Sequence, residues 1–208
     1  MPGSIHKQHK HRQSIGLKAN SMSMTTNPRE IIMEVGQWAT NNFGPYRDSD
    51  YGLVEEIGEK VHGVLKRIQR IRGFEVDAHF YAHVKDALGD AMVYLSDWCA
   101  QRNAFYQVPD EQAPLTGIGE HDFRRLLKNL LRNTSMIVEL SEDDPACADA
   151  HICSAAASRV AMTLWAIACI WNLNLLRDCL YPTWHQVKER NWKKNPVNAD
   201  KVAVATLQ

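Results

Sequence analysis

The sequence predicts an all-α protein, a bundle of about five helices. Apolar residues recur every three or four positions over several long segments, which is the period of an α-helix. No segment alternates apolar and polar residues over a useful strand length, and Gly, Pro and short polar clusters separate the helical segments. We therefore expect one helical domain over residues 27–196, between an N-terminal tail over residues 1–26 and a C-terminal tail over residues 197–208.

The first predicted helix covers residues 28–43. Asn27 is a favoured N-cap, and Pro28 suits the first helical position because its missing N–H would have no helical partner there. Gly44 and Pro45 then end the helix. Its apolar stripe consists of Ile31, Ile32, Val35, Trp38 and Ala39.

The second predicted helix begins after a polar turn at residues 48–50 and ends near Gly73. A loop over residues 103–119 is long enough to form a lid or a dimer arm. Two further helices are predicted over residues 77–101 and residues 121–140. An alanine-rich fifth helix follows, and the segment 141–145 before it could supply its cap. Pro182 interrupts the helical pattern, and a short last helix is predicted over residues 183–191.

The composition argues against several classes of partner. The 208-residue chain has a formal net charge of zero, so no global field attracts nucleic acid or an anionic membrane. Five cysteines with no Cys-x-x-Cys pair indicate reduced thiols in the cytoplasm rather than a disulfide framework. The longest apolar stretch, residues 160–176, is short and interrupted by polar residues, which favours a buried core or interface helix over a membrane span. Residues 1–26 carry basic but no acidic side chains and predict a disordered tail.

Two helical segments carry acidic residues at spacings that share a helix face. Glu56 and Glu59 belong to one segment, and Asp86 and Asp90 to the other. If the two faces meet, four carboxylates converge, and such a cluster fits Mg²⁺, or Mn²⁺, which prefer oxygen ligands. The alternative is a solvated acidic face, because Glu56 and Glu59 lie opposite the apolar side of their helix. A glycine beside each acidic pair suggests that another backbone passes close.

The same segments resemble a known family. Glu55-Glu56-Ile57-Gly58-Glu59 and Asp86-Ala87-Leu88-Gly89-Asp90 are similar to the signature of MazG-type all-α nucleoside triphosphate pyrophosphohydrolases, which is Glu-Glu-x-x-Glu followed by Glu-x-x-Asp. Ala87 stands where the family has its second-motif Glu, and Asp86 is the nearest substitute. The resemblance extends over residues 28–100 and, less closely, over residues 180–196.

This resemblance implies a Mg²⁺-dependent enzyme that cleaves a nucleoside triphosphate between its α- and β-phosphates, giving a monophosphate and pyrophosphate. The metal ligands would be Glu56, Glu59, Asp90 and Asp86, while Glu55 would position the attacking water. We expect a homo-oligomer, a dimer or a tetramer, in which the small residues of the fifth helix permit close packing. The expected substrate-binding residues are Trp38, Asn42, Lys66, Tyr94, Arg190, Trp192, Lys193 and Lys194.

Two other functions are consistent with parts of the sequence. Ala87 favours a catalytically degenerate helical dimer that acts as a nucleotide-binding or interaction module. Glu59-x-x-His62 fits the helix motif of carboxylate-bridged di-iron bundles, but such a site needs a second Glu-x-x-His, and the sequence contains none.

Overall fold

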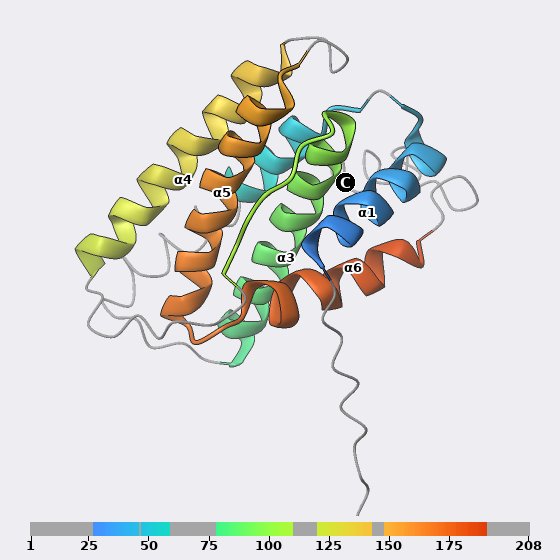
Figure 1. Ribbon diagram of the computed structural model, residues 1–208. Coiled ribbons are helices and arrows are strands. Elements are labelled where there is room, and N and C mark those ends of the chain that lie inside the picture. Colours follow the sequence, from blue (N-terminus) through green and yellow to red (C-terminus); the bar gives the residue numbers. More distant parts are fainter. Residues whose placement is uncertain (1–26, 46, 59–77, 110–119, 143–147, 191–208) are drawn as a thin grey trace, which may run out of the picture.

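The computed structural model describes residues 27–45, 47–58, 78–109, 120–142 and 148–190, and over these residues the chain is helical without strands. The predicted all-α class is therefore confirmed for the described part of the chain. Residues 49–58 form a helix in addition to the labelled elements (Figure 1). The labelled elements are α1 (Pro28–Phe43), α3 (Ala78–Gln101), α4 (Glu120–Ser141), α5 (Ala150–Ile170), the π-helix η1 (Leu175–Leu180) and α6 (Tyr181–Lys188).

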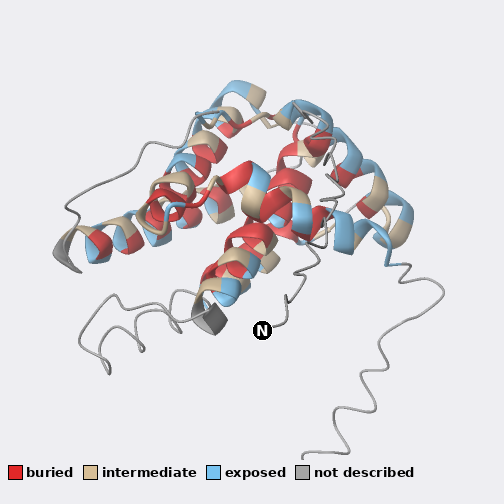
Figure 2. Cartoon of the chain, turned by 90° about the horizontal axis from the view of Figure 1, so that it is seen from below, coloured by how far each residue is buried: buried red, intermediate tan, exposed pale blue. Residues whose placement is uncertain are grey.

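Helix α3 lies at the centre and packs against α1, α5, η1 and α6 (Figure 1). Most of its side chains from Ala87 to Cys99 are buried, whereas the surrounding helices show exposed outer faces (Figure 2). Trp98 is fully buried, and its Nε1–H donates to Ser141 Oγ over 2.8 Å. This hydrogen bond satisfies the one polar group of a large core side chain.

Helices α4 and α5 form an antiparallel pair on one flank of α3 (Figure 1). Near one end Phe123 packs edge-to-face on Trp171, and further along the pair Asn133 Nδ2 donates to Thr163 Oγ1 over 3.1 Å. Helix α5 is long and apolar enough to cross a membrane, with 56% of its most apolar window buried inside the protein. A buried core helix of a globular protein passes the same test. Several side chains of α5, among them Val160, Leu164 and Ile167, belong to the hydrophobic core, which is the position predicted for this segment.

The segment after α3 runs back along α5 in an extended conformation (Figure 1). The backbone N–H of Phe105 donates to Ser154 Oγ over 3.0 Å, and that of Gln107 donates to Ser158 Oγ over 3.2 Å. The two serines lie one helical turn apart, and the two N–H groups belong to alternate residues of an extended segment. The spacing of the serine hydroxyls therefore matches the spacing of the N–H groups that donate to them. The first part of the predicted loop is thus packed down, and residues 110–119 lie outside the described residues.

The boundaries of α1 agree with the sequence analysis. Asn27 Oδ1 accepts from the N–H of Arg29 over 3.0 Å, and Pro28 occupies the first turn. Gly44 ends the helix with a φ of 94°, a conformation that side-chain-bearing residues rarely adopt.

Two predicted boundaries are wrong. The cap of the fifth helix is Asp149, which accepts from the N–H groups of His151 and Ile152, rather than a residue of the segment 141–145. Pro182 does not interrupt the last helix, because it lies in the first turn of α6, where its missing N–H costs little. The helical path continues from η1 into α6.

The predicted close approach at the glycines holds for Gly89 alone. A Cβ on Gly89 would lie 2.0 Å from Thr183 Oγ1 and 2.8 Å from the carbonyl oxygen of Cys179, so α3 and the C-terminal helices pack backbone against backbone there. A Cβ on Gly58 would meet no described atom within 4 Å. The interpretation of Gly58 as a packing residue is therefore wrong for the part of the chain that the structure describes.

Candidate functional site

A cavity of about 440 Å³ opens between α1, the helix over residues 49–58, α3 and the end of α6. Acidic, aromatic and basic side chains occupy different parts of its wall. Five of the predicted site residues line it, namely Trp38, Glu56, Asp90, Tyr94 and Arg190. We call this cavity the α1–α3 pocket.

The acidic part of the pocket contains Glu56 and Asp90, which come from different helices. Each residue is partly buried, and the Oε2 atom of Glu56 is fully buried. Tyr94 lies one turn beyond Asp90 on α3, with its ring against Gly52, where a Cβ would be 2.2 Å from Tyr94 Cε1. The glycine thus makes room for the tyrosine beside the two carboxylates.

The electrostatics of Tyr94 show how closely the acids gather. Burial raises the pKa of Tyr94 above its ordinary value, and the charges of Glu56, Glu55, Asp90 and Asp97 raise it further, in that order. Negative charge near a phenol disfavours the phenolate, so the hydroxyl keeps its proton to a higher pH than an ordinary tyrosine does. Carboxylates from both predicted acidic segments therefore raise the pKa of the same side chain, Tyr94.

The other predicted acids differ in position. Glu55 and Asp86 are exposed and do not line the pocket, and Glu59 lies outside the described residues. Ala87 is 9% exposed and shares a small apolar cavity of about 40 Å³ with Glu56. The position where the resembled family has a Glu thus faces the same region as Glu56, and Asp86 faces solvent instead.

Glu56 and Asp90 are residues that could hold a magnesium ion. Mg²⁺ is commonly held by one or two carboxylates together with water and substrate phosphates, and Glu56 and Asp90 supply that donor set. Within the described ranges, no group of three or more His, Cys, Asp or Glu side chains is arranged to hold a metal. Two protein carboxylates are therefore the part of the predicted ligand set that the described residues bring together.

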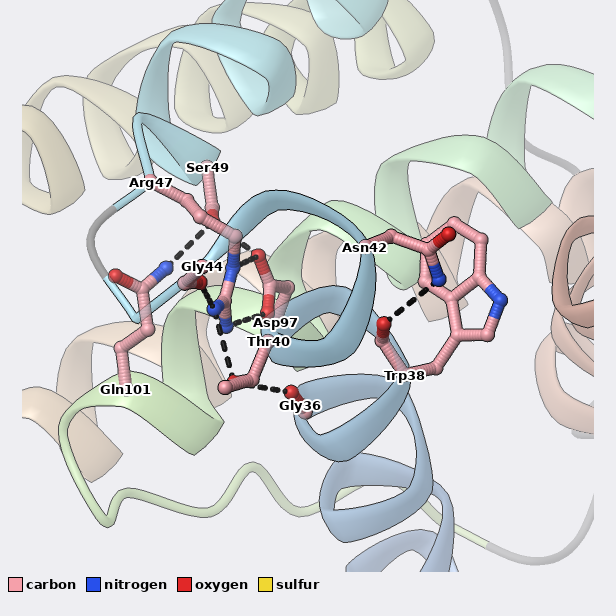
Figure 3. Close-up of polar contacts among 9 residues, drawn as sticks. All are labelled: Gly36, Trp38, Thr40, Asn42, Gly44, Arg47, Ser49, Asp97 and Gln101. Atoms are coloured by element: carbon pink, nitrogen blue, oxygen red, sulfur yellow. Dashed lines mark hydrogen bonds and ion pairs between the residues drawn. The ribbon is translucent and has the colours of Figure 1, made fainter. Parts of the chain in front are cut away.

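A buried ion pair forms the wall beside Ser49 (Figure 3). Arg47 Nε donates to Asp97 Oδ2 over 2.9 Å, and a second guanidinium nitrogen donates to Asp97 Oδ1 over 2.5 Å. The same guanidinium donates to Thr40 Oγ1 over 3.0 Å and to the carbonyl of Gly44. Because Arg47 is held by these bonds, its role is to fix the wall rather than to bind a mobile anion.

Sequence reasoning missed this ion pair. Asp97 follows Asp90 by seven residues, so the two share one face of α3, and this spacing could have placed Asp97 at the pocket. Arg47 stands in the turn between two helices, where no periodic signal identifies a partner fifty residues away. Ser49 Oγ, which donates to Asp97 Oδ2 and accepts from Gln101 Nε2 over 2.6 Å, completes the connection.

The aromatic wall is built on Trp38. Its ring is half-buried and meets the rings of Phe43 and Trp184 edge-to-face, each at 5.7 Å between centroids. Trp184 of α6 donates its Nε1–H to Glu34 Oε2 of α1 over 3.0 Å. These contacts hold α6 across α1 and bring Val187 and Arg190 to the pocket.

Of the remaining predicted substrate residues, Asn42 is described by the structure, and it does not line the pocket. Its Nδ2 donates to the carbonyl of Trp38 over 2.9 Å (Figure 3). Lys66 and the segment from Trp192 to Lys194 fall outside the described residues. Arg190 is therefore the cation of the predicted phosphate-binding set whose position is described.

Comparison of the chain with protein-family models, with curated proteins and with solved structures gives no match. The described residues define an all-helical protein with a pocket that has carboxylates on one part of its wall and an aromatic surface on another.

Proposed function

We propose that the protein is a Mg²⁺-dependent nucleoside triphosphate pyrophosphohydrolase, which hydrolyses its substrate to a nucleoside monophosphate and pyrophosphate. The resemblance to the MazG-type family supports the reaction class. The observation that carries the proposal is the placement of Glu56 and Asp90, from two separate acidic segments, on the wall of one pocket with Trp38 and Arg190.

Each part of the pocket suits one part of a nucleotide. The Trp38 ring offers an aromatic surface for the base. Glu56 and Asp90 would hold the ion, and Arg190 would pair with phosphate oxygens at the end of α6. A volume of about 440 Å³ falls within the range of small-molecule and cofactor sites.

The chain's own residues bind, orient and polarise in this proposal. The hydroxyl of Tyr94 is protonated at neutral pH, as that of an ordinary tyrosine is, and its raised pKa keeps it protonated to higher pH, so it can donate a hydrogen bond to a substrate oxygen. The Arg47–Asp97 pair fixes the turn before the helix that carries Glu56. When bound, Mg²⁺ supplies a Lewis acid for the phosphate oxygens and lowers the pKa of a coordinated water. One water is consumed, and one phosphoric anhydride bond breaks.

The test is pyrophosphate release from a panel of canonical and modified nucleoside triphosphates, with Mg²⁺ and with EDTA. We expect metal-dependent release of pyrophosphate together with the monophosphate, and the panel ranks the bases. Release of single phosphate would show that the cleavage position is wrong. No release from any substrate, with the protein folded and Mg²⁺ present, would refute the enzymatic proposal.

A second function is favoured by Ala87. Its side chain is apolar and nearly buried beside Glu56, at the position where the resembled family has an acid. A chain that lacks this acid could bind nucleotides without hydrolysing them. A nucleotide-dependent rise in the melting temperature without turnover would support this binding module, because a ligand that binds only the folded state stabilises it.

A further inference from the structure

A second cavity, of about 410 Å³, opens where the turn after α1 meets the ends of α3 and α4. Its volume lies within the range of small-molecule sites, and we call it the α3–α4 pocket. Three acidic side chains line it, those of Asp48, Asp50 and Glu142. Glu56 and Asp90 line the α1–α3 pocket and not this one, so the two cavities have separate sets of carboxylates.

Asp50 is the most buried of these three acids, with 7% of the residue exposed. It lies in the first turn of the helix over residues 49–58, where a carboxylate can accept a hydrogen bond from a backbone N–H. Among the described residues, none donates a hydrogen bond to the Asp50 carboxylate or forms an ion pair with it. A buried carboxylate without a partner costs free energy, so its place on a cavity wall indicates a ligand that donates to it.

The side-chain amide of Gln101 adds a neutral acceptor to the same cavity. Its Nε2 donates to Ser49 Oγ over 2.6 Å, and Ser49 Oγ donates in turn to Asp97. The nitrogen is thereby directed to Ser49, and the amide oxygen points away from that serine (Figure 3). This oxygen can therefore accept a hydrogen bond from a ligand in the α3–α4 pocket.

Two arginines line the α3–α4 pocket as well, and both have contacts within the protein. Arg47 is bound to Asp97 by two hydrogen bonds, which balance its charge. Arg102 is buried, and its guanidinium lies 4.7 Å from the centroid of the Trp98 ring. With Arg47 balanced, three carboxylates face one remaining cation, so the wall has an excess of two negative charges.

We propose that the α3–α4 pocket is a second ligand site, which binds a small organic dication, a diamine or a polyamine. One ammonium group donates to Asp50 and to the amide oxygen of Gln101, and another pairs with the exposed Glu142. The methylene chain between them packs on Val138. The exposed ring of Tyr51 offers a face for the cationic end.

A metal ion or an anion fits this cavity less well. A volume of about 410 Å³ far exceeds what a single ion fills, and no three acidic, His or Cys side chains of the described ranges are arranged to hold a metal. An anion would meet the repulsion of three carboxylates. A diamine carries its charges at separate points, so it satisfies the acceptors without requiring them to converge.

The experiment is isothermal titration calorimetry of the full chain with putrescine, a short diamine, at about 0.15 M salt, where distant exposed charges are screened. The control ligands are butylamine, which has a single ammonium group, and butanediol, which has none. We expect putrescine to bind and to raise the melting temperature. Butylamine should bind at least about tenfold more weakly, and butanediol should not bind. No nucleotide is present, so this result is independent of the proposed hydrolysis.

Asp50→Asn keeps the shape of the side chain, removes its charge and should weaken putrescine binding at least about tenfold. Without putrescine this variant should melt no lower than the original chain, because it no longer buries a carboxylate without a partner. Glu142→Gln changes an exposed side chain, so it should keep the fold and weaken binding about two- to fivefold.

The matched control is Glu139→Gln, which changes another exposed acid of α4 that lines neither pocket. Glu139→Gln and Glu56→Gln should both retain the affinity for putrescine. Loss of binding in Glu56→Gln would place the diamine in the α1–α3 pocket and overturn the proposal. So would absence of putrescine binding to the original chain, equal binding of butanediol, or unchanged affinity in Asp50→Asn and Glu142→Gln. A melting temperature of Asp50→Asn well below that of the original chain, without ligand, would give Asp50 a structural role and overturn it as well.

Discussion

Arg47 and Asp97 join the turn after α1 to the last part of α3 through two parallel hydrogen bonds, although fifty residues separate them in the chain. Their side chains are 7% and 10% exposed, so the pair is shielded from water. It also lines the α1–α3 pocket, next to the helix that carries Glu56. A buried pair of this kind stabilises one arrangement of the pocket wall only if both partners remain.

Removing one partner should therefore cost more than removing both. We expect Asp97→Asn or Arg47→Met to lower the free energy of unfolding by about 3–5 kcal/mol, because each leaves a charge buried without its partner. The double variant should lose less than either single variant, and therefore less than the sum of the two single losses. Urea unfolding of the four proteins measures this coupling. Strict additivity would mean that the two side chains do not stabilise each other.

Activity should depend on Glu56 and Asp90 far more than on Asp86. Glu56→Gln and Asp90→Asn each remove a charge from the pocket and are expected to reduce pyrophosphate release more than about 100-fold, since a metal site contributes several kcal/mol. Glu59→Gln should do the same if Glu59 completes the ligand set. Asp86→Asn is the matched control, because Asp86 is exposed and does not line the pocket. An equal loss in all variants would contradict the assignment.

The position of Ala87 can be tested by adding the acid that it lacks. Ala87→Glu places a carboxylate in a nearly buried, apolar site beside Glu56, so it should destabilise the metal-free protein. If Glu56 and Asp90 hold Mg²⁺, the ion should raise the melting temperature of this variant more than that of the original chain. Ala87→Gln, of the same size but uncharged, should show no such additional rise. Equal Mg²⁺ responses in all three proteins would refute a metal site at this position.

Tyr94 should make stability fall at alkaline pH. Its ordinary pKa is 10.0, and burial and the surrounding carboxylates raise its pKa in the folded protein. Because the folded state disfavours the phenolate, this contribution is complete below pH 10 and is lost as the pH rises through the folded-state pKa. As the pH rises above 10, the free energy of unfolding of Tyr94→Phe should therefore fall less than that of the original chain. Denaturant unfolding at a series of alkaline pH values measures the difference.

The carboxylates can be separated from burial in the same measurement. Glu56→Gln should move the pKa of Tyr94 back toward its ordinary value, because it removes the largest charge contribution and leaves burial in place. The absorbance of tyrosinate reports this pKa. In each background, the signal of the protein with Tyr94→Phe is subtracted from the signal of the protein that keeps Tyr94. A pKa that does not respond to Glu56→Gln would place that carboxylate away from the phenol.

Two glycines of similar sequence context should respond in opposite ways to alanine. Gly89→Ala inserts a methyl group against the Cys179 carbonyl and Thr183, so it should cost about 1–3 kcal/mol or displace the C-terminal helices. Gly58→Ala meets no described atom and improves helix propensity, so it should stabilise by up to about 1 kcal/mol. Thermal unfolding of both variants is the measurement, and a stabilising Gly89→Ala would show that α3 and α6 are not in close contact.

The sequence by itself determined the helical class and most helix boundaries, because both follow from local rules. The apolar period fixed which residues of α1 and α3 face inward, and Asn27, Pro28 and Gly44 marked the ends of α1. The same rules brought Glu56 and Asp90 forward as candidates, since acids at helical spacing are visible without a structure. The two boundary predictions that failed, at Pro182 and at the cap of α5, concern helix ends, where proline and several possible caps permit more than one start.

Only the tertiary structure decided which candidates share a pocket. Helical spacing places Asp86 and Asp90 on one side of α3, but the packing of the neighbouring helices leaves Asp86 exposed and places Asp90 on the wall of the pocket that Glu56 also lines. The Arg47–Asp97 pair and the contact of Trp184 with Glu34 join residues that are far apart in the chain. Such contacts depend on how the helices pack against one another. The repeat of apolar residues within one helix does not say which other helix it will contact.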